Sequence, residues 1–481
     1  MDQLASRRSQ PGDWLELSAF GRVKERFESA LRRARATGSP ALVSLTANVD
    51  RATDPTALVA GARKSGEQWF CMEQPDREGS SVAGLGCVRA LEASGGERFS
   101  SIAARWRSLV AGAIIDGHAG PPGSGLVALG GFAFAAEGGS SPEWRGFAPG
   151  SLLVPALCAA RRGGQAAVTI NLDAAPDDTV EDLLGRAHRR LSTVAPTPLP
   201  LYDPSPAGAY SVRSPMPPAH FEEAVARAVQ RIRAGELEKI VLAREVEVRA
   251  PVDHDPAALI GLLREAFPSC YVFAVGRGEA TFIAASPELL VRREGQRAST
   301  VALAGSIRRS ADPAVDDHLG EQLLRSGKDR DENLIVVRRI VRALRPHALW
   351  VTAAPEPAVV RVANIQHLGT PIRAQLAAPL GAIELAGILH PTPAVGGEPG
   401  ELAARLIPAL EGFDRGWYAG AIGWTDASGD GELCVALRCA LLRGRLARLY
   451  AGCGIVRDSE PDAELAESEV KLEALLPLLA G

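Results

Sequence analysis

The sequence has little of what nucleic-acid-binding and membrane proteins require. Aromatic residues make up only 5% of the 481 residues, which leaves few side chains to stack on bases. A formal net charge of -4 gives no electrostatic reason for binding nucleic acid or an anionic membrane surface. The sequence also lacks a run of eighteen apolar residues that could span a bilayer. We therefore expect neither nucleic acid nor a membrane among the partners.

Cysteine is scarce as well, and the common cofactor motifs are missing. The seven cysteines are an odd number, are scattered and form no CxxC pair, so neither a disulfide framework nor a zinc site is predicted. The N-terminal residues 1–8 lack the apolar segment of a secretory signal, which makes the cytoplasm the default location. No phosphate-loop motif follows the glycine pair Gly130 and Gly131, so we interpret that pair as a bulge or a close packing contact.

What is present is the composition of a globular protein. Hydrophobic residues make up 46% and charged residues 23%, in a chain long enough for two or three ordinary domains or one large one. A Pro/Ser-rich stretch at 195–206 indicates a linker or crossover. Strand and helix patterns come in blocks rather than in strict alternation. The fold class is therefore predicted to be α+β, with largely antiparallel β-sheets packed against helices.

Apolar spacing predicts the individual elements. Helices are expected at 22–35, 99–113, 221–232 and 331–344, the last with Leu334, Val337, Ile340 and Leu344 facing inward. Strands are expected at 41–46, 68–72, 125–134, 239–248, 271–275, 281–285 and 288–292.

Near the C-terminus, residues 418–471 contain three apolar runs divided by turn signals at 426–431 and 443–445. This pattern predicts an antiparallel meander, followed by a helix that begins near Pro461 and is capped by Ser459. The middle run is expected to be one strand. Its alternation places Arg438 on a face of small side chains, with room for a ligand above it.

The same stretch carries the first indication of a binding site. Glycines in 451–454 allow close approach to the backbone, and the next helix places Glu464, Glu467 and Lys471 on one face. Together with Arg438, this pattern suggests a site for an anionic small molecule and a divalent cation. Taken alone, a strand arginine such as Arg438 is usually solvated. A helical face with two glutamates and a lysine usually forms an ordinary surface ion pair.

A series of segments in the second half resembles the chorismate-utilising enzymes, which include isochorismate, salicylate, anthranilate and aminodeoxychorismate synthases. The matching segments, in order, are 238–248, 285–293, 302–309, 326–333, 363–372, 389–397, 413–424, 432–440 and 451–471. The first half is a weaker match, through 68–70 and 130–134. The resemblance implies one large fold made of an N-terminal half, 1–215, and a chorismate-binding catalytic region, 216–481. It is strongest to isochorismate synthases of the menaquinone type.

The resemblance implies roles for two residues in the chemistry. Isochorismate forms when water adds at C2 of chorismate and the C4 hydroxyl leaves, which requires a base and an acid. Lys239 matches the general base and Glu288 the general acid, and burial would raise the pKa of Glu288 as its role requires. The ammonia-using members lack this lysine, so its presence favours water as the nucleophile. A lysine at a strand entry and a glutamate at a strand start are the structural alternatives.

The resemblance also implies a magnesium ion. Glu332 and Glu467 match its ligands and Glu464 contributes nearby, through water; carboxylate oxygens suit Mg²⁺. Without the resemblance, the spacing of Asp329 and Glu332 at a helix start would indicate a capping arrangement.

The remaining implied residues bind substrate. Arg438 and Tyr418 match positions that bind the pyruvyl carboxylate, where a guanidinium can bind in a bidentate manner. The others are backbone contacts at Gly305, Gly452 and Gly454, Lys471 near the second carboxylate, and pocket positions at His367 and Thr392. Two segments depart from the family pattern. Residues 464–468 lack the usual aromatic residue and threonine, and 394–397 reads Ala-Val-Gly-Gly.

The sequence thus predicts a Mg²⁺-dependent isochorismate synthase that acts on chorismate and feeds menaquinone synthesis. The alternatives are a salicylate synthase, a siderophore-pathway isochorismate synthase and a non-catalytic chorismate-binding protein. The resemblance also implies a monomer, as is frequent in the water-using branch.

Overall fold

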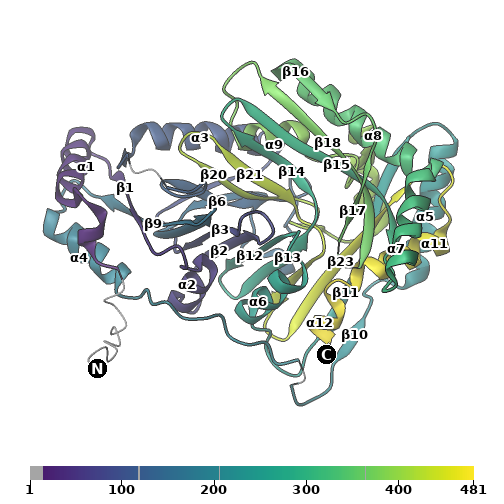
Figure 1. Ribbon diagram of the computed structural model, residues 1–481, viewed down its shortest axis with the longest axis horizontal. Coiled ribbons are helices and arrows are strands. Elements are labelled where there is room, and N and C mark those ends of the chain that lie inside the picture. Colours follow the sequence, from purple (N-terminus) through teal and green to yellow (C-terminus); the bar gives the residue numbers. More distant parts are fainter. Residues whose placement is uncertain (1–14, 118–119, 205, 363, 481) are drawn as a thin grey trace.

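The structure is a computed structural model that describes residues 15–117, 120–204, 206–362 and 364–480. It combines helices with two large, mainly antiparallel sheets, which confirms the predicted α+β class (Figure 1). Residues 1–8, where no secretory signal is expected, lie outside the described residues, as do Ser205 of the Pro/Ser-rich stretch and Ala363 of a family segment. None of the helices in the described ranges combines the length and the apolar character that crossing a bilayer requires.

Short local signals set where many helices begin. In α2, α6 and α7 an Asp-Pro pair starts the helix: the aspartate accepts hydrogen bonds from two backbone N–H groups and the proline takes the first helical position. The helices of the described chain are α1 Val23–Thr37, α2 Pro55–Ala62, α3 Arg98–Gly112, α4 Val180–Leu191, α5 Pro218–Arg233, α6 Pro256–Ala266, α7 Pro313–Arg325, α8 Gly327–Leu344, α9 Ala382–Leu389, α10 Gly400–Glu411, α11 Pro461–Leu472 and α12 Leu476–Ala480.

The larger sheet has thirteen strands among the described residues, and all its pairs are antiparallel except β1 with β5. Its order is β10 (Ser211–Arg213), β11 (Lys239–Arg249), β23 (Leu446–Ile455), β22 (Cys439–Arg443), β13 (Ala280–Ser286), β12 (Tyr271–Arg277), β2 (Trp69–Gln74), β3 (Ser80–Leu85), β8 (Leu157–Arg162), β9 (Gln165–Ala174), β1 (Ala41–Asn48) and β5 (Ile114–Ile115), with β19 (Gly397–Glu398) beside β11.

The smaller sheet has ten strands in the described ranges, all antiparallel. Its order is β16 (Ala348–Ala353), β18 (Ile365–Leu376), β15 (Arg297–Arg308), β14 (Leu289–Glu294), β21 (Gly431–Val435), β20 (Ala421–Asp426), β6 (Val127–Phe132), β7 (Gly150–Val154) and β4 (Arg89–Ala93), with β17 (Ala358–Arg361) beside β18.

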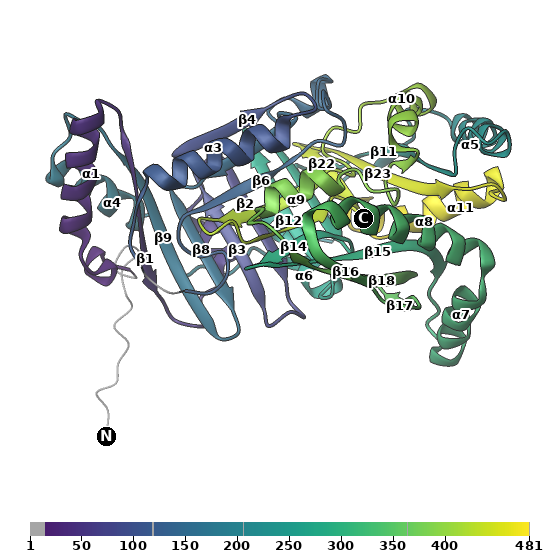
Figure 2. The same ribbon diagram turned by 90° about the horizontal axis from the view of Figure 1, so that it is seen from above.

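The alternation of side chains along the strands divides the interior into two cores. In β12, Phe273 and Val275 belong to the core shared with the smaller sheet, whereas Val272 and Ala274 face the core beneath α2 and α6. Helices α3, α8 and α9 lie along the smaller sheet (Figure 1). Viewed from above, α1 and α4 lie at one end of the molecule and α5, α7 and α11 at the other (Figure 2).

Both sheets contain strands from both sides of residue 215. Strand β12 pairs with β2 in the larger sheet, and β20 pairs with β6 in the smaller sheet. The two regions therefore build one continuous architecture, and their division by function stays a prediction.

The chain crosses between the sheets at two neighbouring places. Strand β13 of the larger sheet continues into β14 of the smaller one, and β21 returns to β22. The crossings bind each other, because the Ala285 N–H donates to Arg438 O and the Val435 N–H donates to Glu288 O. The prediction of one strand over the middle run of the meander is therefore wrong. It is two strands in two sheets, and Arg438 turns between them with a φ of 48°.

Three other local predictions have clear outcomes. Leu334 is exposed, so its predicted inward position is wrong; the inward face of α8 instead carries Glu332 and Ile335. Helix α11 does begin at Pro461, but its N-cap is Glu460, and Ser459 accepts a hydrogen bond from the Val456 N–H instead. The packing interpretation of the glycine pair is confirmed, since a Cβ on Gly130 would lie 2.1 Å from Ser151 O.

Candidate active site

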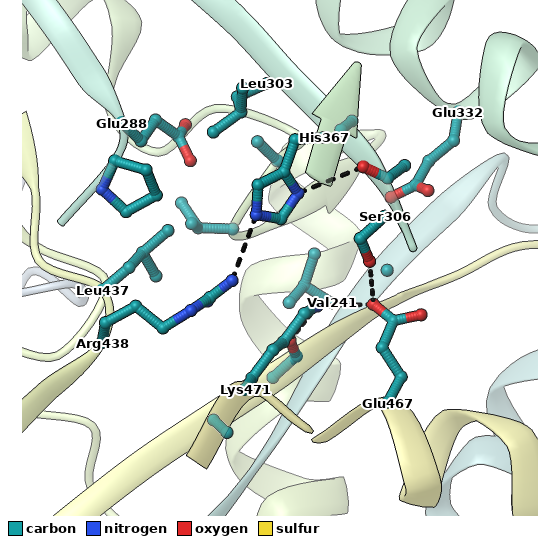
Figure 3. Close-up of a pocket in the computed structure, with 18 of the residues that line it drawn as sticks. Val241, Glu288, Leu303, Ser306, Glu332, His367, Leu437, Arg438, Glu467 and Lys471 are labelled. Atoms are coloured by element: carbon teal, nitrogen blue, oxygen red, sulfur yellow. Dashed lines mark hydrogen bonds and ion pairs between the residues drawn. The ribbon is translucent and has the colours of Figure 1, made fainter. Parts of the chain in front are cut away.

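A cleft with about 620 Å³ of empty space, part of it open to solvent, lies where the two crossings meet β11 and β23 of the larger sheet and β15 and β18 of the smaller one (Figure 3). Ten of the predicted site residues line it: Glu288, Gly305, Glu332, His367, Tyr418, Arg438, Gly452, Gly454, Glu467 and Lys471. In Figure 3, Glu332 and Glu467 lie at one side of the cleft and Glu288 at the other. The fold therefore brings together residues that are more than a hundred positions apart in the sequence.

Lys239 lies behind the cleft wall, with its side chain fully buried. Its Nζ is 2.7 Å from Oε1 of Glu332 on α8. The neighbouring strand makes room for this ion pair because it carries glycine. A Cβ on Gly454 would lie 2.1 Å from Glu332 Oε1 and 2.9 Å from Lys239 Cε. Strand β23 therefore needs glycine here for the pair to form.

Glu288 lies in the crossing from β13 to β14 and is buried. Burial raises its pKa to about 8, although the positive charges of Lys239, Arg438 and Lys471 oppose that rise. The predicted direction of the pKa shift is confirmed. At neutral pH the carboxyl is protonated, so it can donate a proton into the cleft.

A chain of hydrogen bonds fixes Arg438 in the cleft. The Arg438 Nη2 lies 3.1 Å from His367 Nε2, and His367 Nδ1 lies 3.1 Å from Gly305 O. Because arginine can only donate, Nε2 accepts and Nδ1 carries the proton. Burial, with the charges of Arg438 and Lys471, lowers the pKa of His367 to about 3, so the imidazole stays neutral. His367 therefore orients the guanidinium without adding charge.

Glu467 is held as a carboxylate. Its Oε1 accepts a hydrogen bond of 2.8 Å from Ser306 Oγ and lies 2.6 Å from Lys471 Nζ. Burial alone would raise the pKa of Glu467, but Lys471, Ser306 and Lys328 outweigh it and lower that pKa to about 2. At neutral pH one cleft therefore contains a neutral carboxyl, Glu288, and a negatively charged carboxylate, Glu467.

Glu464 lies one turn before Glu467 on α11 but does not line the cleft. It is buried and pairs with Lys328, whose Nζ lies 3.0 Å from Glu464 Oε1. Burial and the negative charge of Glu467 raise the pKa of Glu464. Each of the three predicted metal-binding glutamates is therefore paired with its own lysine: Glu332 with Lys239, Glu464 with Lys328, and Glu467 with Lys471.

The donor set on this side fits a hard divalent cation. Carboxylate oxygens of Glu464 and Glu467 lie within 4.8 Å of each other, and Glu332 lines the cleft beside Glu467. The Cys453 sulfur lies in the same group but is a soft ligand that Mg²⁺ does not favour. Carboxylate oxygens that can share a cation with water molecules are what Mg²⁺ prefers.

Thr392 is the third predicted residue that does not line the cleft. Its side chain is buried, and Oγ1 accepts a hydrogen bond from the Ala394 N–H. The cleft surface at this loop is formed by Ala394 and Val395 instead.

Several residues at the site were missed in the sequence. Ser306 and Lys328 lie in segments that resemble the family, near the predicted site residues Gly305 and Glu332. Their polar side chains, which contact Glu467 and Glu464, are the feature of the sequence that could have identified them. The apolar part of the wall, which includes Leu303, Val395 and Leu437, offers no chemical signal of its own.

Comparison with known proteins gives consistent results over nearly the whole chain. The sequence pattern of the family described as chorismate binding enzyme matches residues 29–480. A "Salicylate biosynthesis isochorismate synthase" of Pseudomonas aeruginosa is 38% identical over 462 residues, which cover 95% of this chain and 94% of the relative. "Isochorismate synthase MenF" of Bacillus subtilis is 30% identical over 459 residues, covering 94% and 96%. The solved structure of the menaquinone-specific isochorismate synthase MenF of Escherichia coli has a TM-score of 0.75 at 27% identity and covers 94% of this chain and 100% of that one.

Proposed function

Because the chain belongs to the family of chorismate-binding enzymes, we propose that it is an isochorismate synthase, an isomerase that converts chorismate to isochorismate. The relatives that match it along nearly their whole length carry this name. The proposal agrees with the prediction, made from the presence of Lys239 in the sequence, that water is the nucleophile.

The observation that carries the proposal is a neutral carboxyl at one side of the cleft and a buried lysine behind the other side. Glu288, with its pKa raised to about 8, retains a proton for the departing C4 hydroxyl. Glu332 lies across the cleft from Glu288 (Figure 3), and behind it is Lys239, whose Nζ is 2.7 Å from Glu332 Oε1. We propose that Lys239, once released from this ion pair as the free amine, takes the proton from the attacking water. An acid and a base on separate sides of the substrate are what this exchange of hydroxyl groups needs.

The positive groups of the cleft suit a substrate with two carboxylates. Arg438 is held by His367 at 3.1 Å and is proposed to bind the pyruvyl carboxylate together with Tyr418. Lys471 also donates to Gly452 O at 2.8 Å, which places its ammonium beside an open strand backbone. Gly305, Gly452 and Gly454 would let the substrate contact that backbone, while Thr392 would support the loop that carries Val395 rather than touch substrate.

The proposed cofactor is Mg²⁺. Glu332 and Glu467 would hold it, with Glu464 behind them, and when bound it would supply positive charge to a substrate carboxylate. The cation would replace the lysine partners that these carboxylates have in the structure.

The setting of the enzyme remains as the sequence predicts it. We propose a cytoplasmic monomer whose isochorismate feeds menaquinone synthesis. Supply of isochorismate for salicylate is the second destination, favoured by the 38% identity to a relative named for salicylate biosynthesis.

The test is product analysis by chromatography after incubation with chorismate, with Mg²⁺ or with a chelator. The expected result is isochorismate that appears only with the metal. Salicylate with pyruvate as the main product would identify a salicylate synthase instead. No turnover under either condition, with chorismate still bound, would indicate a non-catalytic binding protein.

A further inference from the structure

A fully buried ion pair lies directly behind the cleft, outside the predicted site. Arg415 follows helix α10, and Glu411 is the last residue of that helix. Their side chains are 3% and 1% exposed. The guanidinium Nε donates to Glu411 Oε2 at 2.9 Å, and Nη2 donates to Glu411 Oε1. Neither residue lines the catalytic cleft.

The guanidinium of Arg415 also donates hydrogen bonds to two segments of the cleft wall. Nη1 donates to Val395 O at 2.8 Å and Nη2 donates to Val241 O at 3.0 Å. Both valines line the cleft. Glu411 Oε1 in turn accepts a hydrogen bond of 2.7 Å from the Ala243 N–H. The pair therefore holds strand β11, which begins with Lys239, against the loop that contains Val395.

The face of the same guanidinium supports a third piece of the wall. Its central carbon lies 5.5 Å from the ring centroid of Tyr418, which lines the cleft, and 4.3 Å from that of Phe134. A guanidinium over aromatic rings at such distances is attracted by their π electrons. One planar group thus touches three wall elements that come from distant parts of the sequence.

Stability alone is a poor explanation for such a pair. Removing two charges from water is costly, and an apolar pair of similar volume often stabilises a protein at least as well. A lysine could keep the charge, but its single ammonium cannot make the in-plane contacts of a guanidinium. The arrangement of the contacts is specific to the fork of arginine.

We propose that Arg415, held by Glu411, is a positioning residue that sets the geometry of the cleft wall for the chemical step. It touches neither substrate nor the reacting atoms, and acts through Val241, Val395 and Tyr418. The inference rests on the proposed function, because its readout is the rate of isochorismate formation. A misplacement of the wall by about 1 Å can lower such a rate on the order of 100-fold.

The test compares Arg415→Lys with the wild type by steady-state kinetics. The expected result is a fall of at least about tenfold in kcat, with a smaller change in KM, because the substrate still meets Arg438 and Lys471. Arg264→Lys is the matched control. Arg264 pairs with Asp54 and Glu73, at 2.7 Å and 3.5 Å, and these residues do not line the cleft. This control should keep kcat and KM within about twofold of the wild type.

A rescue experiment separates positioning from general loss of structure. A second hollow, with about 1750 Å³ of empty space that includes open solvent, is lined by Glu411 and Arg415 among other residues and gives a small cation a route to this place. Guanidinium chloride at millimolar concentration, far below denaturing levels, should restore kcat of Arg415→Ala several-fold and should leave kcat of Arg264→Lys unchanged.

Two results would overturn the proposal. The first is an Arg415→Lys variant whose melting temperature falls while kcat per folded molecule stays at the wild-type value. The second is a loss of activity equal to that of Arg264→Lys. A wild-type enzyme that forms no isochorismate would instead refute the proposed function and leave the kinetic comparison without a substrate.

Discussion

At the scale of single residues, the cleft gives the same side chain two different charge states. Burial raises the pKa of Glu288 to about 8, although Lys239, Arg438 and Lys471 oppose that rise. Glu467 contacts Lys471 and Ser306, and its pKa is lowered to about 2. Environment alone separates a proton donor from a carboxylate that can bind a cation.

The protonation of Glu288 predicts a pH dependence. As pH rises through about 8, the free enzyme loses the proton that the acid must donate, so kcat/KM for chorismate should fall. Between about pH 4.5 and 8 the folded chain holds this proton while the unfolded chain has lost it, so the residue also makes stability fall with rising pH. A rate profile from pH 6 to 9.5 tests the first effect. Thermal unfolding of Glu288→Gln beside wild type tests the second.

Two results would contradict the assignment of Glu288. One is a rate profile without an alkaline limb near pH 8. The other is a Glu288→Gln variant that keeps wild-type activity, because an amide cannot donate the proton.

Lys239 gives a second prediction. Replacement by alanine should abolish isochorismate formation, since general base catalysis contributes about 10²–10⁴-fold. Chorismate binding and the circular dichroism spectrum should stay close to those of wild type. Retained turnover in a folded Lys239→Ala variant would remove the residue from its proposed role.

Lys328 gives a third prediction, on metal binding. Its ammonium lies 3.0 Å from Glu464 Oε1, so it would compete with the proposed cation for that side of the site. Lys328→Gln should bind Mg²⁺ about two- to fivefold more tightly in isothermal titration calorimetry, the size expected for loss of a partly exposed ion pair. Arg325→Gln is the control, because it removes one positive charge from an exposed position nearby. Equal affinities of the two variants would show that Lys328 does not compete with the metal.

At the scale of elements, the site depends on strands that come close at glycine. Strand β23 passes Glu332 and Lys239 at Gly454, where an added Cβ would overlap both side chains. Gly454→Ala should therefore lower kcat by about tenfold or more, because it displaces the ion pair behind the cleft. Gly327→Ala is a suitable control, since no atom lies within 4 Å of its added Cβ. Equal kcat values for the two variants would mean that the pair tolerates displacement.

The elements also show which parts of the structure the sequence could predict. Helix α5 was found because its apolar spacing records which face is buried, and strand β11 because its apolar run is typical of a buried strand. The crossing at Arg438 was missed, because alternation continues through 433–441 and says nothing of which sheet a residue joins. Most of the site residues came from the family resemblance. The contacts of Ser306 and Lys328 were not predicted, since they join elements distant in sequence.

At the scale of the whole molecule, residues 216–481 supply only part of each sheet. Strand β12 lies between β13 and β2, and β20 lies between β21 and β6. Without residues 1–215 both strands would become open edges of their sheets. The apolar core that contains Phe273 and Phe282 would also lose Phe70 and Phe132. Open, apolar edges of this kind pair with other chains and aggregate.

We therefore expect residues 216–481 expressed alone to be insoluble, and co-expression with residues 1–215 to recover a soluble complex. The two pieces should co-elute in size-exclusion chromatography and form isochorismate, since the pairing of β12 with β2 and of β20 with β6 does not depend on a continuous chain between them. Full-length protein prepared in parallel serves as the control for activity. A soluble, monomeric and active fragment 216–481 would show that the catalytic region is an independent domain and that the N-terminal strands only cover it.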